Sequence, residues 1–597
     1  MLTSTTLLPW LAAVLSLSLA YPWARWLLDL PHDPQEPRPR EPALALLLTV
    51  GLSLGGLAWL LTLLAAISPA LVAFWPVTLA GLALSGVGWG LWRRRGGRRA
   101  APATPGQGCG RRGWASRVAV GAIVALVGLT LFNAAYWPFR EDDTMALYGP
   151  MAYRFAQSGR FDGAGLYDAY PRLVPLAMAY PHLAGGAPNE YIARLVTAVL
   201  ALGTVGAAYA LGRDLYGRTV GLGAAFLTVT VPILPHWSAS GYTDLPAGTT
   251  YALATIFAWR LFSRPHPVHA LLAGGMAGLA VLTKNGAWLV AASLAGWAAY
   301  SRVYGRPAAG NSAPPGGVAG HPISLPHLAL MIGAFLVVAG PWYGHALLAY
   351  GQLIPPTGWT EQADHSLGAL LRPALTPSHF LVSGPLGMAG LGGMLAALWR
   401  SRRRPDPRPA LLVGFAAPFW LVWWWFFSYD LRFLLLVWPL FAVMGAWAAA
   451  RLGGLLPPAW QRRAARALPL ALIVIALPAA RMAVDHKGEI LRNPLMSDAE
   501  RHRVQLGTRY EVIEWIGEHV PAEARLLTSD YLFVYPLMQS HTEPFVWDTR
   551  EQEQVSRFDY WIVGPDFAPP AWADAQTLRL RYESGGYAVY EVLHHER

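Results

Sequence analysis

The stretch VAVGAIVALVGLTLFNAAYWPFREDDTMALY, residues 118–148, places three consecutive acids directly after a long apolar run. The run is long enough to cross the ~30 Å hydrocarbon core of a bilayer as a helix. Glu141, Asp142 and Asp143 then stand where such a helix would leave the membrane. Carboxylates are costly close to lipid unless they are solvated or paired, so these acids are candidates for function.

Similar apolar runs recur along most of the chain. Its 597 residues are 54% hydrophobic and only 14% charged, which excludes an ordinary soluble protein and indicates a polytopic α-helical membrane protein. The first run lacks a basic leader and a small-residue cleavage site, so we expect a retained helix. We expect fourteen membrane-spanning helices, near residues 4–29, 42–66, 70–92, 117–137, 191–212, 219–236, 245–263, 268–283, 286–300, 327–346, 378–398, 409–427, 431–451 and 467–484.

The positions of the arginines predict the orientation in the membrane, because basic residues near helix ends are kept on the cytoplasmic side. The segments RRRGGRR (93–99), RSRRR (400–404) and QRR (461–463) fall in alternate loops, which we therefore place inside. The protein is then a multi-pass protein of the plasma (inner) membrane, with its active site on the extracytoplasmic side. The loops expected outside are 138–190, 237–244, 347–377 and 428–430.

The chain divides into four parts. Residues 1–92 are accessory membrane helices, 93–116 a basic cytoplasmic linker, 117–486 the membrane catalytic domain and 487–597 a soluble domain. From Gly488 onward there are 18 Asp and Glu residues against 10 arginines, and no apolar run that could span a membrane. Fourteen crossings from an outside N-terminus leave this last part outside.

The soluble domain has the pattern of a small α/β fold. Residues 509–520 predict a helix, and residues 524–530, 558–564 and 587–593 predict strands. The single Cys109 falls in the basic linker, so no internal disulfide is expected. The net charge of +11 comes from the cytoplasmic loops, so we expect no nucleic-acid partner.

Two of the outer acids have a structural as well as a functional interpretation. Asp143 precedes residues that follow one helical face, and it could cap that helix. One cap needs one acid, however, and three are present. In GYTDLPAG, Asp244 stands just before a helix whose early positions include Pro246, which fits a cap and a catalytic role equally.

Two basic residues interrupt apolar segments on the same side. Lys284 is one of only two lysines in a chain with 44 arginines, and it lies in a short break between apolar runs. It is either an interfacial anchor or a point-charge contact to a phosphate. Tyr429, Asp430 and Arg432 interrupt an aromatic-rich stretch, and they form either an internal ion pair or an anion site.

The order of these motifs resembles the GT-C glycosyltransferases. Within that class it is similar to the family 39-type enzymes that use polyprenyl-phosphate sugars, which include protein O-mannosyltransferases and the aminoarabinose transferases of lipid A. The resemblance covers roughly residues 117–486. Two departures are the Asp-Asp pair, where the family often has Asp-Glu, and Met145, where some relatives have a basic residue. The motifs are the acidic pair, YRFAQSGRFDG with YPRLVPLAMAYP, GYTDLPAG, AGLAVLTKNGAWL, GPWYGHALLAYG and DLRFLLLVWPL.

The resemblance implies transfer of a hexose or pentose from a polyprenyl-phosphate donor to an acceptor hydroxyl on a protein, lipid or polysaccharide, with inversion. It implies that Asp142 and Asp143 act as base and acceptor-orienting residue, with Asp142 aligned to the family's base, and that Asp244 positions the acceptor. The residues implied to bind the donor phosphate are Lys284, Arg432 and Tyr429, with Arg172, Arg154 and Arg160 as weaker candidates.

No metal or other cofactor is expected to be required. A divalent ion is the alternative, because His236, His345 and His365 lie near the outer acids, but no zinc or calcium ligand spacing is present. The alternative function is a transporter or flippase of lipid-linked sugars, which would place charged groups near the bilayer midplane in matched halves. The acids instead lie at helix mouths on one side, which favours the transferase.

Overall fold

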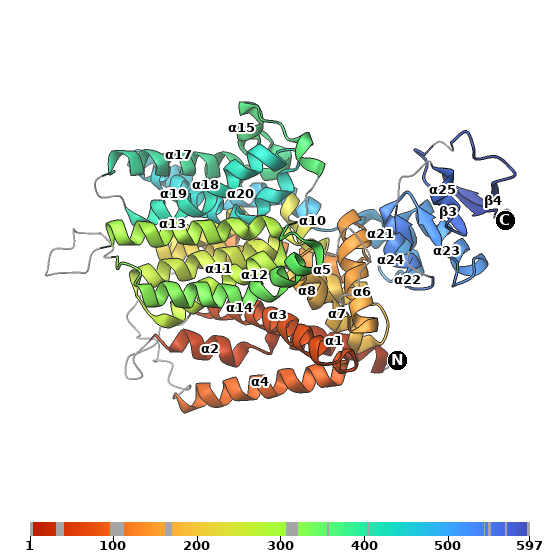
Figure 1. The fold of residues 1–597 in the computed structure, drawn as a ribbon. Helices are drawn as coiled ribbons and strands as arrows, with labels where there is room; N and C mark the ends of the chain where they lie inside the picture. Colours follow the sequence, from red (N-terminus) through yellow and green to blue (C-terminus); the bar gives the residue numbers. More distant parts are fainter. Residues whose placement is uncertain are drawn as a thin grey trace.

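The computed structural model describes the chain apart from eleven short segments, and most of the described residues form one helical bundle (Figure 1). Cys109 and residues 96–112 of the basic linker lie outside the described residues, as do residues 161–169 of the first outer loop. The described residues are 4–31, 41–95, 113–160, 170–305, 320–354, 358–402, 406–541, 544–546, 551–567 and 570–593.

Helices cover all fourteen predicted spans, which confirms the polytopic α-helical class. In the described part of the chain, eight helices are long and apolar enough to cross a membrane, or nine if the pair α9–α10, bent by 73°, forms one span. Fourteen crossings therefore stays a prediction. The helices are α1 (Ser4–Ser18), α2 (Tyr21–Asp29), α3 (Pro42–Ile67), α4 (Phe74–Arg94), α5 (Trp114–Tyr136), α8 (Glu190–Tyr216), α9 (Arg218–Val229), α10 (Ile233–Ala239), α11 (Asp244–Ser263), α12 (Pro267–Thr283), α13 (Leu289–Tyr304), α14 (Leu325–Tyr350), α17 (Ser383–Arg400), α18 (Pro407–Phe427), α19 (Trp438–Leu455) and α20 (Pro458–Met482).

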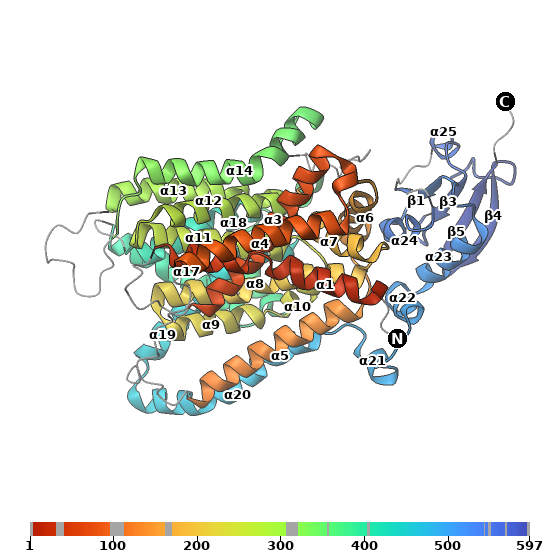
Figure 2. The same cartoon turned by 90° about the horizontal axis from the view of Figure 1, so that it is seen from below.

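The core of the bundle lies around α11, which is buried along almost its whole length by α8 and α12. Small residues allow close approach: a Cβ at Gly274 of α12 would clash with the Met331 carbonyl of α14. By contrast, α5 and α20 pack side by side at the edge of the bundle (Figure 2) and leave most of their apolar side chains uncovered. Such an apolar outer surface is what lipid contact requires.

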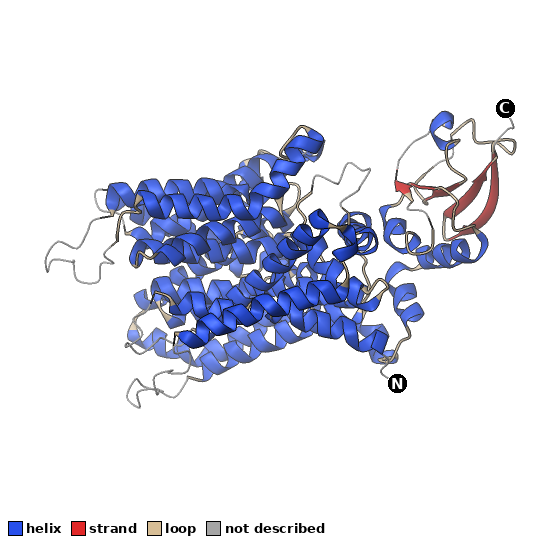
Figure 3. Cartoon of the chain, turned by 60° about the horizontal axis from the view of Figure 1, so that its bottom comes forward, coloured by secondary structure: helices blue, strands red, loops and turns tan. Residues whose placement is uncertain are grey.

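The C-terminal part is a small α/β domain, as the sequence predicts, and it holds all the described strands (Figure 3). Its sheet has the order β2-β1-β3-β5-β4, in which β1 runs parallel to β2 and β3, and β5 antiparallel to β3 and β4. The predicted helix and strands correspond to α23, β1, β3 and β5, whereas β2 and β4 were not predicted. The elements are α22 (Asp498–Leu506), α23 (Thr508–His519), β1 (Leu526–Thr528), α24 (Val534–Leu537), β2 (Phe545–Val546), α25 (Gln552–Val555), β3 (Tyr560–Val563), β4 (Leu578–Ser584) and β5 (Tyr587–Val592).

This domain packs against one end of the bundle, beside α6 (Gly149–Ser158) and α7 (Leu173–Gly185) (Figures 1 and 2). Leu506, Tyr535 and Met538 of the domain join the buried apolar cluster of the bundle itself. The domain therefore packs on the membrane part through shared core contacts. It lies at the end of the bundle where the three acids follow α5.

Candidate active site at the end of the bundle

The three acids lie in residues 137–143, which we call the acidic segment. This segment follows the end of α5 at Tyr136 and leads into a π-helical turn over Thr144–Tyr148, before α6 begins. Single π-helical turns are frequent at functional sites, because the extra residue redirects neighbouring side chains. The Asp143 amide donates to the Tyr242 hydroxyl (3.0 Å), and Thr144 Oγ1 donates to the Ser240 carbonyl (2.8 Å). The loop that follows α10 therefore fixes the path of the acids.

The three consecutive acids have different surroundings. Glu141 faces His236, with Oε1 to Nε2 at 3.3 Å. Asp142 is exposed, and the charges of Asp530 and Arg509 in the C-terminal domain act on it. Asp143 faces the bundle, with Oδ2 3.8 Å from an Arg432 guanidinium nitrogen, and its side chain accepts no helix-capping bond. The Asp143 carboxylate is therefore not a helix cap.

Asp244 is the first residue of α11, and its side chain is 1% exposed. One carboxylate oxygen accepts from the Lys284 ammonium, and the other lies 3.8 Å from Arg432 Nε. The N-cap residue of α11 is Thr243, which makes no side-chain cap, so Asp244 is not a cap either. A buried carboxylate needs such partners, because an unpaired charge in the interior is strongly destabilising.

Lys284 and Arg432 come from two breaks between helices. Lys284 has an extended backbone between α12 and a short 3-10 turn, and its ammonium lies 4.5 Å from the Phe433 ring centre. Arg432 follows Asp430, which caps the next turn and pairs with Arg432 Nε at 3.2 Å. The predicted ion pair of the Asp-x-Arg set is thus present, and the same guanidinium also reaches Asp143 and Asp244.

Aromatic rings enclose the Arg432 guanidinium. Its central carbon lies 4.7 Å from the Trp237 ring centre, 4.5 Å from that of Tyr242 and 5.0 Å from that of Phe433. Such cation–π contacts hold an arginine in place while its N–H groups stay free to bind anions. We call Asp143, Asp244, Lys284, Asp430 and Arg432 the charged cluster.

The electrostatics differ among the acids. Although the Asp142 side chain is exposed, its partial desolvation raises its pKa, and the charges of Glu141 and Asp530 add to this effect. Burial also raises the pKa of Asp143, although Arg432 and Lys284 oppose it. For Glu141, burial alone would raise the pKa, but the hydrogen bond and charge of His236 outweigh it and lower the pKa. Asp142 and Asp143 are therefore the acids whose proton affinity suits proton transfer.

A cavity of about 340 Å³ is lined mainly by apolar side chains of α3 and α14, together with Leu176 of α7 and Leu282 of α12. Leu282 in its wall is two residues from Lys284. Arg160, Arg172 and His345 supply its polar lining, and the Arg172 guanidinium stacks 4.7 Å from the Trp342 ring centre. The cavity thus combines an apolar wall with two arginines.

The remaining predicted residues lie at varying distances from the charged cluster. Tyr429 packs edge-on against Phe433 at 5.9 Å, and burial together with Asp430 raises the pKa of Tyr429 to about 12. Arg154 lies on α6. His365 contacts the Trp425 carbonyl (2.8 Å). Among the residues that the structure describes, no group of three or more His, Cys, Asp or Glu side chains is placed to hold a metal ion.

Sequence reasoning missed the aromatic residues of the site. Trp237 and Tyr242 both precede Asp244 in the chain and pack against Arg432, and the Tyr148 hydroxyl bonds to the Thr243 hydroxyl (3.1 Å). The signal was available, because both rings belong to the segment HWSASGYTDLPAG. Their role as walls around an arginine depends on Arg432, almost two hundred residues later, and no local pattern indicates that partner.

The fold has known counterparts. A crystal structure of ArnT from Cupriavidus metallidurans bound to undecaprenyl phosphate matches with a TM-score of 0.53 and 16% identity, over 80% of this chain and 98% of that one. The apo structure of the same enzyme matches with a TM-score of 0.52 and 16% identity, over 79% of this chain and 97% of that one. The archaeal oligosaccharyltransferase AglB from Archaeoglobus fulgidus matches with a TM-score of 0.48 and 15% identity, over 77% of this chain and 70% of that one.

At the sequence level, residues 173–320 match the family described as dolichyl-phosphate-mannose-protein mannosyltransferase. No curated protein sequence matches significantly. The match includes GYTDLPAG and AGLAVLTKNGAWL, the segments that supply Asp244 and Lys284 to the charged cluster. Together with the match to ArnT over nearly the whole of that chain, this confirms the resemblance: the protein has the fold of the GT-C membrane glycosyltransferases.

Proposed function

We propose that the chain transfers a hexose or pentose from a polyprenyl-phosphate donor to an acceptor hydroxyl. The observation that carries the proposal is the chain of ion pairs through which Asp244 joins Lys284 to Arg432 and Arg432 pairs with Asp143. The apolar cavity, which has Leu282 in its wall, supports it. Paired cations bind a phosphate, a carboxylate takes a hydroxyl proton and an apolar cavity accommodates an isoprenoid chain. This is the donor chemistry expected from the sequence.

The fold neighbour supports the choice of donor, since the ArnT structure is described as bound to undecaprenyl phosphate. In our proposal the isoprenoid chain occupies the 340 Å³ cavity and the phosphate lies against Lys284 and Arg432. Arg172 and Arg160 in the cavity wall, and Tyr429 beside Phe433, are the further donor contacts. Arg154 on α6 remains a predicted weaker contact to the same phosphate.

The proposed reaction is a single displacement. Asp143 takes the proton of the acceptor hydroxyl while that oxygen forms a bond to the anomeric carbon. The bond between this carbon and the phosphate oxygen breaks, polyprenyl phosphate leaves with the electron pair, and the configuration inverts. Lys284 and Arg432 stabilise the charge that grows on the leaving phosphate. A phosphate leaves readily as an anion, so the proposal requires neither a general acid nor a metal.

The geometry changes the preferred base from Asp142 to Asp143. The sequence favoured Asp142 because it aligns with the first acid of the family's pair and because Asp143 could cap a helix. Asp143 makes no cap and pairs with Arg432 at 3.8 Å, whereas the nearby charges that act on Asp142 include Asp530 and Arg509 of the C-terminal domain. We therefore propose Asp143 as base, Asp142 as an acceptor-orienting residue and Asp244 as the carboxylate that positions Lys284.

We further propose that the protein lies in the plasma membrane with this site on the extracytoplasmic side, where protein, lipid or polysaccharide acceptors are available. The arginine-rich loops support this orientation. A comparison of envelope glycans and lipids by mass spectrometry, with and without the protein, identifies the acceptor. If only the leaflet distribution of a lipid-linked sugar changes, the protein is a transporter.

The direct test is sugar transfer by purified variants, with a panel of undecaprenyl-phosphate hexoses and pentoses as donors. Asp143→Asn should lower the rate by at least ~10²-fold, the usual contribution of a placed base, with an unchanged melting temperature. Asp142→Asn should cost less, and Glu141→Gln serves as the matched acid outside the chemistry. If Asp143→Asn is active while Asp142→Asn folds and is inactive, the base is Asp142 and not Asp143. Full activity in both removes this segment from the mechanism.

A further inference from the structure

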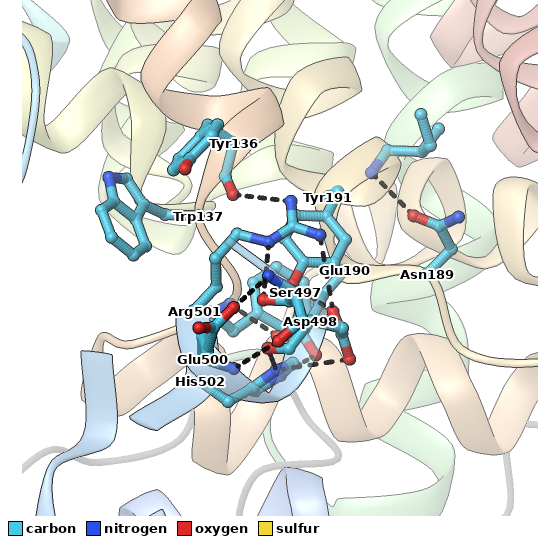
Figure 4. Close-up of polar contacts among 12 residues, drawn as sticks. Tyr136, Trp137, Asn189, Glu190, Tyr191, Ser497, Asp498, Glu500, Arg501 and His502 are labelled. Atoms are coloured by element: carbon cyan, nitrogen blue, oxygen red, sulfur yellow. Dashed lines mark hydrogen bonds and ion pairs between the residues drawn. The ribbon is translucent and has the colours of Figure 1, made fainter. Parts of the chain in front are cut away.

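The helix α22 of the C-terminal domain lies against the start of α8, and polar contacts join the two (Figure 4). His502 Nε2 lies 2.9 Å from Glu190 Oε1, and His502 Nδ1 lies 2.9 Å from the Asp498 carbonyl oxygen. A carbonyl and a carboxylate only accept hydrogen bonds, so both ring nitrogens must donate. The arrangement therefore fits the charged imidazolium paired with the Glu190 carboxylate.

The second oxygen of Glu190 reaches the acidic segment. Glu190 Oε2 accepts a hydrogen bond from the Phe139 amide at 2.6 Å, and Phe139 is two residues before Glu141. Glu190 is 8% exposed, so this carboxylate is buried and has its two oxygens committed to two donors. A single side chain thus connects a histidine of the C-terminal domain to the backbone that carries the acids.

The same helix makes a second set of contacts with this region. Arg501 stacks 4.5 Å from the Tyr191 ring centre and donates to the Tyr136 carbonyl (3.2 Å), while Tyr191 donates its hydroxyl proton to Asp498. Tyr136 ends α5 and Tyr191 lies at the start of α8. The domain therefore contacts both the end of α5 and the start of α8, next to the acidic segment (Figure 4).

A third contact comes from Tyr535 in α24. Its ring packs edge-on against Phe139 with centres 5.0 Å apart. On its other side the ring lies so close to Gly149 that a Cβ there would approach it to 2.8 Å. Phe139 and Gly149 stand before and after the acids, so the C-terminal domain holds the acidic segment at both ends.

We propose that Glu190 and His502 are positioning residues for the transfer reaction, through which the C-terminal domain fixes residues 139–143 and hence the place of Asp143 against the two cations. This inference rests on the proposed function, because it assigns the domain a part in that same site. A misplacement of about 1 Å at a reacting group can cost ~10²-fold in rate, so a small release of the segment has a measurable effect.

The test uses the full-length protein in nanodiscs with the variant His502→Gln, which removes the charge while keeping a donor. We expect kcat to fall by roughly tenfold or more, with the KM for an undecaprenyl-phosphate sugar within about twofold. Hydrogen–deuterium exchange of a peptide covering residues 137–145 should increase at the same time. His502→Lys keeps a cation that can donate to Glu190, so it should recover part of kcat and of the exchange protection.

The matched control is Arg503→Gln on the same helix. Arg503 pairs with Glu514 at 2.9 Å on the solvent side, so its loss should change neither kcat nor exchange at residues 137–145. If His502→Gln does not fold, the same measurements on Glu190→Gln, which keeps one acceptor oxygen, decide. Unchanged kcat and exchange in a folded variant overturn the proposal, as does failure of both variants to fold, which indicates a purely structural contact.

The exchange measurement separates this inference from the proposed function. If Asp143→Asn keeps full activity, the assignment of the base fails, yet increased exchange in His502→Gln still reports release of the acidic segment. If Asp143→Asn is inactive while His502→Gln has normal exchange and rate, only the positioning role fails.

Discussion

At the scale of single residues, Lys284 has a place that arginine would fit poorly. Its compact ammonium lies between the Asp244 carboxylate and the Phe433 ring, which is 4.5 Å away. A planar guanidinium would need more room and a different hydrogen-bond direction. This gives a physical reason for one of two lysines in a chain with 44 arginines to stand here.

Replacement of Lys284 should impair both transfer and stability. In Lys284→Met, buried Asp244 keeps only Arg432, so we expect weaker donor binding together with a lower melting temperature. Lys284→Arg should restore part of the transfer. The double variant Lys284→Met with Asp244→Asn should regain stability without regaining transfer, because it removes the unpaired carboxylate. Full transfer by Lys284→Met would reduce this residue to an interfacial anchor.

The contact of His502 with Glu190 should also depend on pH. Burial alone would lower the pKa of His502, but the charge and hydrogen bond of Glu190 outweigh it and raise the pKa to about 9 from the ordinary 6.5. The contribution of this contact is therefore complete below about pH 6.5 and is lost as pH rises through about 9. The other groups that face the ring are Asp498 of its own helix, Tyr191 of α8 and Tyr510 of α23.

This dependence can be measured as deuterium exchange at residues 137–145 between pH 6 and pH 10, corrected for the intrinsic rate. Protection should fall near pH 9 in the wild type, whereas His502→Gln should show no step there. A step of equal size in both proteins would assign it to another group.

At the scale of elements, apolar runs predicted the helices because a spanning helix needs about twenty apolar residues in sequence. The strand β4, residues 578–584, escaped prediction because it buries only Leu578 and alternates leucines with arginines. The turn after the acids was expected to be an ordinary helix, for which Asp143 was a possible cap. It is π-helical because Tyr242 and Ser240, about a hundred residues away, hold Asp143 and Thr144, which no local pattern reveals.

The crossing of α12 and α14 gives a prediction about packing. A Cβ at Gly274 would meet the backbone of α14 at Met331, whereas the neighbouring Gly275 has nothing within 4 Å. We expect Gly274→Ala to destabilise the protein by ~1–3 kcal/mol, the usual cost of overpacking, and Gly275→Ala to be nearly neutral. Thermal melting of the two variants in detergent provides the comparison. Equal melting temperatures would mean that the two helices separate at little cost.

At the scale of the whole molecule, the site is assembled from four distant segments that contribute Asp143, Asp244, Lys284 and Arg432. The sequence predicted these residues because a charge inside an apolar run needs a reason. It did not predict their pairing, since Lys284 was expected beside the donor alone and is held by Asp244. It also left the C-terminal domain without a role, because Glu190 and His502 are separated by more than three hundred residues.

The orientation of the whole molecule can be tested by cysteine labelling from outside intact cells in a Cys109→Ser background. Cysteines at the exposed Ala187 and Glu553 should react with an impermeant reagent, because both belong to the end that carries the site. A cysteine at Arg462, which was predicted in a loop and lies in the arginine-rich first turns of α20, should react only after permeabilisation. The opposite pattern would place the site in the cytoplasm and overturn the proposed choice of acceptors.

The seating of the C-terminal domain on the acidic segment has a consequence for biosynthesis. Tyr535 contacts Phe139 and Gly149. Phe139 and Gly149 are synthesised early, and Tyr535 is synthesised near the end of translation, so these contacts form late. While the chain is still attached to the ribosome, the first acids have reached their membrane boundary without the ring and the histidine that hold them. A nascent or truncated chain that ends before residue 498 therefore carries every member of the charged cluster and still has an unfinished site.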